Sequence, residues 1–127
     1  MIRRLRQFLH KRQERAAHRK GRACLCVRAD YQIIEPGEAD LIRALEGMEA
    51  ETGSAFMILS RSDHTYLQCS GDNHIGYDLE YQVNSIEEHF RAAQTNFDCT
   101  EIVRRFLAYS RDGLAWKDGV EWQRIDW

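Results

Sequence analysis

The chain has 127 residues, a formal net charge of −2 and a single proline, a composition that fits one soluble globular domain and excludes a low-complexity segment. No apolar run reaches the roughly 18 residues that a membrane-spanning helix needs, and the polar stretch 10–22 lacks the apolar centre of a signal peptide, so we expect a cytoplasmic protein. The small net charge hides an uneven distribution: residues 1–22 carry about +8, whereas residues 23–127 carry about −10. Such asymmetry bears on the charge of a partner more than on the fold.

The basic segment 1–22 is predicted to form a helix or an arm that is distinct from a single α+β domain over 23–127. It has no glycine or proline before Gly21, and Ile2, Leu5 and Phe8 form a short apolar stripe at helical spacing. The stripe ends at Leu9, so we expect a helix that docks through its first turns, or one that is frayed.

Residues 23–34 favour a strand that ends at the Pro36–Gly37 turn, and a helix is predicted over 38–51. Three hairpin-linked strands follow over 56–60, 65–70 and 75–83, then a weaker strand over 88–94.

In the strand 75–83, Tyr77, Leu79 and Tyr81 alternate with polar residues, which predicts an acidic outer row that contains Asp78 and Glu80. A second helix starts near residue 98, where Asp98 or Thr100 can cap it, and a short edge strand is expected over 120–125. The predicted fold is therefore α+β: an antiparallel meander sheet of four to five strands, two main helices packed on one face, and the basic N-terminal helix or arm.

The sequence shows no catalytic or metal-binding signature, so no catalytic residue, metal or cofactor is predicted. Cys24 and Cys26 are separated by one residue rather than by the two to four of common zinc half-sites, which favours buried, reduced thiols. Two minor alternatives stay open: an enzyme with a cleft built from His64, His74 or Cys69, and a cation site in which Asp72 and Asp78 join His74.

The strongest signal is the set of acidic and aromatic residues that we expect on an exposed surface. Carboxylates accelerate association with a basic partner, and aromatic side chains anchor it, although Trp116 and Trp122 fit a core position equally well. The predicted partner-binding residues are Asp72, Tyr77, Asp78, Glu80, Tyr81, Asp118, Glu121 and Trp122.

Spaced apolar and aromatic positions also run through the second half of the chain: segments 56–60, 66–68, 78–81 and 106–109, with Trp116, Glu121 and Trp122. Over residues 55–127 this pattern resembles small immunity proteins of bacterial polymorphic toxin systems. The resemblance implies a non-enzymatic protein that binds a cognate basic toxin domain and blocks its active site, often with an acidic surface that imitates nucleic acid. Residues 1–22 lie outside the pattern, and the alternative is a small nucleic-acid-associated regulator that uses this arm.

Overall fold

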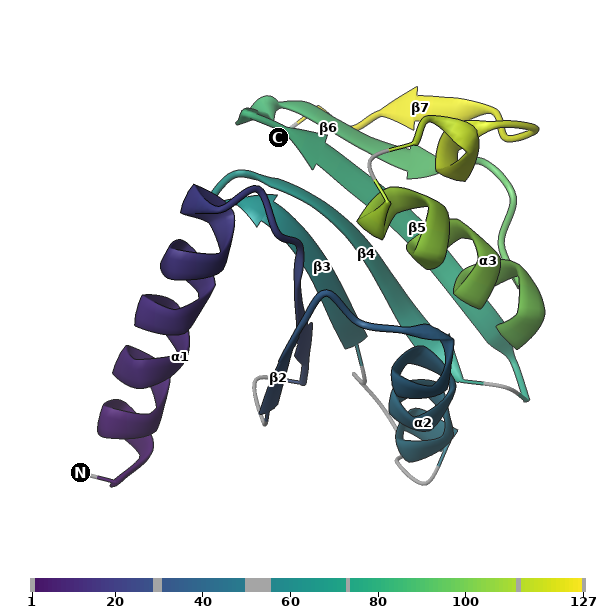
Figure 1. Cartoon of the computed structure of the whole chain (residues 1–127). Helices are drawn as coiled ribbons and strands as arrows, with labels where there is room; N and C mark the ends of the chain where they lie inside the picture. Colours follow the sequence, from purple (N-terminus) through teal and green to yellow (C-terminus); the bar gives the residue numbers. More distant parts are fainter. Residues whose placement is uncertain (1, 29–30, 50–55, 73, 112, 127) are drawn as a thin grey trace.

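The computed structural model describes residues 2–28, 31–49, 56–72, 74–111 and 113–126 (Figure 1). In chain order the elements are α1 (Ile2–Arg19), β1 (Cys24–Val27), β2 (Tyr31–Ile34), α2 (Glu38–Glu49), β3 (Phe56–Ser62), β4 (Thr65–Asp72), β5 (Gly76–Val83), β6 (Ser85–Ala92), α3 (Cys99–Ser110), the 3₁₀ turn η1 (Ala115–Lys117) and β7 (Trp122–Arg124). None of the described helices is both long and apolar enough to cross a membrane.

Within these residues, seven strands form one antiparallel sheet in the order β2-β1-β3-β4-β5-β6-β7. The predicted α+β class is confirmed, but the predicted number of four to five strands is too low. One reason is that the stretch 23–34 is not one strand: Arg28 adopts a left-handed conformation (φ 51°), and the chain returns as β2 beside β1.

The main core lies between one face of the sheet and the helices α2 and α3 (Figure 1). Helix α2 contributes Leu41 and Leu45, α3 contributes Ile102 and Phe106, and all four side chains are fully buried. The prediction of two main helices on one face is confirmed. Asp98 caps α3, since its Oδ1 accepts the Glu101 backbone N–H at 2.8 Å.

Helix α1 lies on the opposite face of the sheet, where it packs on β1, β2 and β3. Its described side-chain contacts come from its second half: Ala17 is buried, and Glu14 and His18 both reach the hydroxyl of Ser60 in β3. The side chains of the apolar stripe that was predicted to dock, over 2–9, lie outside the described part of the chain.

Gly76 offers a direct test of the contact between the start of β5 and the segment that precedes α3. The residue has φ +96°, and a Cβ there would lie 2.5 Å from the Asn96 Cα, because reciprocal 2.9 Å backbone hydrogen bonds between Tyr77 and Phe97 hold the two segments together. We expect Gly76→Ala to lower the free energy of unfolding by about 2 kcal/mol or more, measured by urea denaturation. The matched control is Gly47→Ala in α2, where a Cβ meets nothing within 4 Å and helix propensity should raise stability by about 0.5–1 kcal/mol. Equal stability of Gly76→Ala and the parent would contradict the close approach of the two segments.

Candidate functional site

The half of the sheet beyond α1 presents polar side chains on the face opposite the core. We call this surface the open face and define it by the residues of β4, β5 and β6 that point away from α2 and α3: Tyr66, Gln68, Ser70, Asp78, Glu80, Gln82, His89 and Arg91. Cross-strand pairing places them in rows, one of which runs from Gln68 through Glu80 to Arg91. Strand alternation therefore brings residues from three strands into one array.

A hydrogen-bonded chain fixes the centre of the open face. The side-chain amide of Gln82 donates to the His64 carbonyl at 3.1 Å, so its Oε1 faces His89 Nδ1, also at 3.1 Å. The other ring nitrogen of His89, Nε2, lies 3.1 Å from Glu80 Oε2. Both ring nitrogens of this buried histidine thus face side-chain oxygen atoms, so the ring is held between Gln82 and Glu80.

The two carboxylates of the predicted acidic row differ in their surroundings. Glu80 is half-buried and is also bound by Arg91, whose Nε donates to Oε1 at 3.2 Å, so the Arg91 guanidinium balances its charge. Asp78 is exposed, and within the described residues it has no ion pair. Asp78 is therefore the carboxylate of this face that is best placed to meet a cation from another molecule.

The prediction that Tyr77 and Tyr81 anchor a partner is wrong. Their side chains are 0% and 3% exposed, because the two-residue period of β5 sends them to the core side of the sheet. Tyr81 stacks on Phe90 at 4.9 Å between ring centroids and meets Trp122 edge-on at 4.8 Å. The aromatic side chain on the open face is instead Tyr66, whose hydroxyl lies 3.3 Å from Gln82 Oε1.

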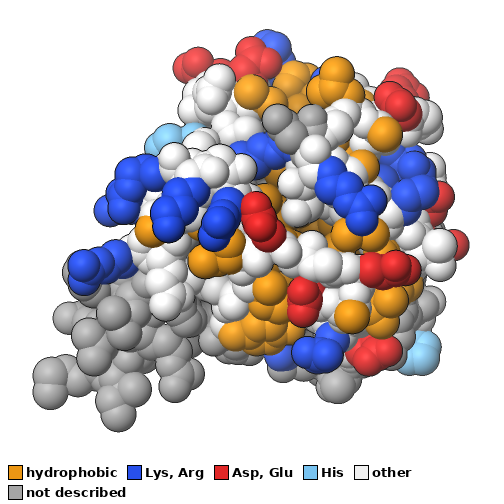
Figure 2. All heavy atoms as spheres, in the orientation of Figure 1, with side chains coloured by type: hydrophobic (Ala, Val, Ile, Leu, Met, Phe, Trp, Pro, Cys, Tyr) orange, Lys and Arg blue, Asp and Glu red, His pale blue; other side chains and the backbone are white. Residues whose placement is uncertain are grey.

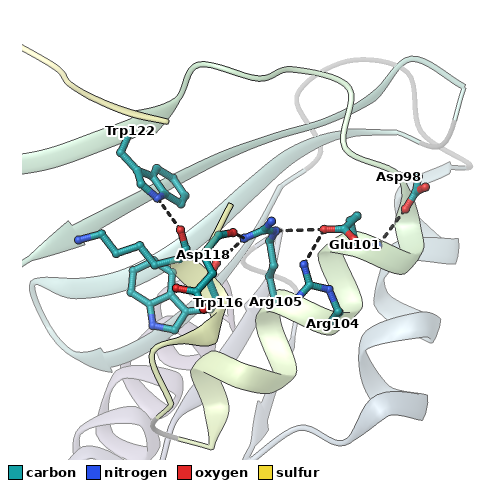
Figure 3. Close-up of polar contacts among 8 residues, drawn as sticks. Asp98, Glu101, Arg104, Arg105, Trp116, Asp118 and Trp122 are labelled. Atoms are coloured by element: carbon teal, nitrogen blue, oxygen red, sulfur yellow. Dashed lines mark hydrogen bonds and ion pairs between the residues drawn. The ribbon is translucent and has the colours of Figure 1, made fainter. Parts of the chain in front are cut away.

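The C-terminal candidates lie in a separate corner of the fold, which hydrogen bonds connect to α3 (Figure 3). The Arg105 guanidinium, 4% exposed, donates to the backbone carbonyls of Trp116 and Asp118 at 2.8 and 2.9 Å, and the half-buried Trp122 donates its indole N–H to the Lys117 carbonyl at 3.0 Å. Trp122 pairs with the core-side residue Ala92, so it lies on the other side of the sheet from the open face.

The predicted partner-binding residues therefore do not form one surface. Asp78 and Glu80 lie on the open face, whereas Trp122 belongs to the C-terminal corner, where Asp118 and Glu121 are exposed. The side chain of Asp72 lies outside the described part of the chain. Sequence reasoning missed His89 and Arg91, although their alternation with Phe90 and Ala92 is a strand signal.

The residues proposed for an enzymatic cleft are not brought together. His64 and His74 are exposed at turns on opposite ends of β4, and Cys69 between them points into the core. Burial raises the pKa of the Cys69 thiol well above its usual range, and burial followed by the charge of Glu14 raises the pKa of Cys24 to about 12. Both thiols are therefore protonated at neutral pH, as expected for buried structural cysteines.

The ion pairs on α3 predict a pH effect on stability. The hydrogen bond from Arg104, with the charge of Arg105 nearby, lowers the pKa of Glu101 below its usual value of 4.5. Since the folded state favours the carboxylate, this contribution is present above pH 4.5 and is lost as the pH falls through the lowered pKa. Glu101→Gln should therefore lose less stability than the parent between about pH 5 and pH 3, measured by urea denaturation. Glu121→Gln, on an exposed carboxylate outside this contact, should follow the parent; parallel curves for all three proteins would contradict the assignment.

No family model, no curated protein and no solved structure matches this chain. Its function is therefore argued from the arrangement and charge of its own residues.

Proposed function

We propose that this chain is a non-enzymatic binding protein of the immunity type, which neutralises a cognate bacterial toxin by covering a basic active site or substrate groove. The observation that supports the proposal most is the open face, where Asp78 is exposed beside a hydrogen-bonded array of Glu80, Gln82 and His89.

Two physical properties of this face favour protein binding. The hydrogen bonds among Gln82, His89 and Glu80 hold side chains in place before a partner arrives, so association costs less conformational entropy. The exposed carboxylate of Asp78, in a segment 23–127 that carries about −10, attracts a basic surface and raises the association rate.

Tyr66 takes the anchoring role that the buried tyrosines of β5 cannot perform. It is half-buried, so part of its ring remains available, and its contact with Gln82 limits the freedom that it would lose on binding. A basic partner would thus meet Asp78 at the charged end of the face and Tyr66 as its aromatic contact.

The test uses the C-terminal domain of the protein encoded by the adjacent open reading frame as the partner. Asp78→Lys should lower the association rate constant about tenfold at low salt, and the parent rate should fall as salt rises, both measured by stopped-flow fluorescence. Glu46→Lys is the matched control, because it makes the same charge change at an exposed site on α2, across the sheet. An unchanged rate for Asp78→Lys would contradict this placement of the interface, and failure of the domain to bind the parent chain would contradict the choice of partner.

A second candidate function rests on α1. Its second half carries exposed basic side chains, and four of them, Lys11, Arg12, Arg15 and Arg19, line a hollow of about 280 Å³. Figure 2 shows Lys and Arg side chains gathered at the left of the view, over α1. We call these four residues the basic ridge. A row of cations attracts the phosphates of a nucleic acid, and this favours a small nucleic-acid-associated regulator as the alternative.

Charge reversal tests the alternative better than deletion of 1–22, because deletion would also remove Glu14 and His18 from the sheet. If the ridge binds nucleic acid, the parent retains a labelled oligonucleotide, and the combined change Arg12→Glu, Arg15→Glu and Arg19→Glu abolishes retention in fluorescence anisotropy. Arg43→Glu on α2 serves as the control for a lost surface cation. Absence of retention by the parent would exclude this function.

A further inference from the structure

One cluster of potential metal ligands contains none of the open-face residues and lies at the contact between α1 and the β3–β4 hairpin. Glu14 and His18 stand one turn apart on α1, and Asp63 lies in the turn after β3. One ligand atom from each of these three residues lies within 4.8 Å of those from the other two. We call this group the α1–hairpin cluster. It joins segments that are more than forty residues apart in the sequence.

Ser60 lies at the base of the cluster. His18 Nε2 is 2.9 Å from its hydroxyl, and the hydroxyl in turn donates to Glu14 Oε1 at 3.1 Å. In a catalytic triad the acid binds the second ring nitrogen of the histidine, not the serine itself. Ser60 is also buried, so this arrangement does not present a nucleophile to a substrate.

We propose that Glu14, His18 and Asp63 bind a divalent transition-metal ion of the zinc class. One imidazole with two carboxylates is a mixed nitrogen and oxygen set that suits zinc, cobalt or nickel, whereas calcium and magnesium prefer oxygen ligands alone. The proposal is independent of the proposed function, because it uses none of the open-face residues.

The two ligands on α1 need only small movements to meet one ion. His18 Nε2 and Glu14 Oε1 are 4.0 Å apart, and a tetrahedral zinc ion needs its ligand atoms roughly 3.3 Å from one another. Both side chains are on neighbouring turns of one helix and are largely buried, so the ion would need them to approach by less than about 1 Å. Asp63 is exposed in a turn, so it would supply the third ligand from the solvent side of the site.

A metal ion would replace two cationic side chains that now face the carboxylates of the site. Lys11 Nζ now lies 4.0 Å from Glu14 Oε2, and Arg15 Nε lies 3.8 Å from Asp63 Oδ2. Both cationic side chains are more than 60% exposed, and surface pairs of this kind contribute little to stability, so they can turn into solvent when an ion enters. The bound metal would then tie α1 to the β3–β4 turn.

The experiment adds Zn²⁺ alone to the full chain, prepared without a histidine tag and treated with a chelator, and follows binding by isothermal titration calorimetry and by thermal unfolding. Co²⁺ in place of Zn²⁺ reports the coordination through its visible absorption. We expect one site of micromolar affinity and a higher melting temperature with metal. Asp63→Ala should weaken binding by on the order of tenfold or more, and His18→Gln should abolish the visible cobalt bands.

His64→Gln is the matched control, since it removes an exposed imidazole from the same turn and should leave the affinity unchanged. Asp63→Ala changes only an exposed side chain, so it keeps the test decisive if the change at the more buried His18 prevents folding. No heat of binding, or an affinity that Asp63→Ala leaves unchanged, would overturn the proposal.

Discussion

The two-residue period of the central strands is the constraint on which both the core and the open face depend. In β5 it sends Tyr77, Leu79 and Tyr81 towards α2 and α3 and places Asp78 and Glu80 on the opposite side. A shift of one residue in the pairing of this strand would bury the carboxylates and expose the tyrosines. The apolar core therefore stabilises the arrangement of the open face, since the same register determines both.

Helix α1 determines how much of that second face remains open. Glu14, Ala17 and His18 attach its second half to the β1–β3 side of the sheet, where Glu14 and His18 both lie within hydrogen-bond distance of the Ser60 hydroxyl. The basic side chains of this half are consequently held on a packed helix rather than on a loose arm. A cationic ridge and an exposed carboxylate are thus displayed by different parts of one fold, which explains why the net charge of −2 says little about partners.

Local patterns in the sequence predicted the α+β class, the helices near 38 and 98 and the meander of β3 to β5, because hydrophobic period and capping residues are local signals. The contacts of Ser60 with Glu14 and His18 were not predictable in this way, because Glu14 and His18 are 46 and 42 residues away from Ser60 in the sequence. Arg105 shows the same limit. Its burial depends on the carbonyl groups of η1 and the residue after it, and charged residues are expected on the surface.

The contrast between Asp78 and Glu80 changes how charge is counted at the proposed interface. A sequence count gives both residues equal weight, yet Glu80 has His89 within 3.1 Å and Arg91 within 3.2 Å. A cation from a partner would have to compete with Arg91 for Glu80, whereas it can approach Asp78 directly. Long-range attraction then arises mainly from Asp78 and the acidic excess of residues 23–127, and the Glu80–His89–Gln82 array supplies directional hydrogen bonding. Such a face would select its partner by complementary shape and donor placement as much as by charge.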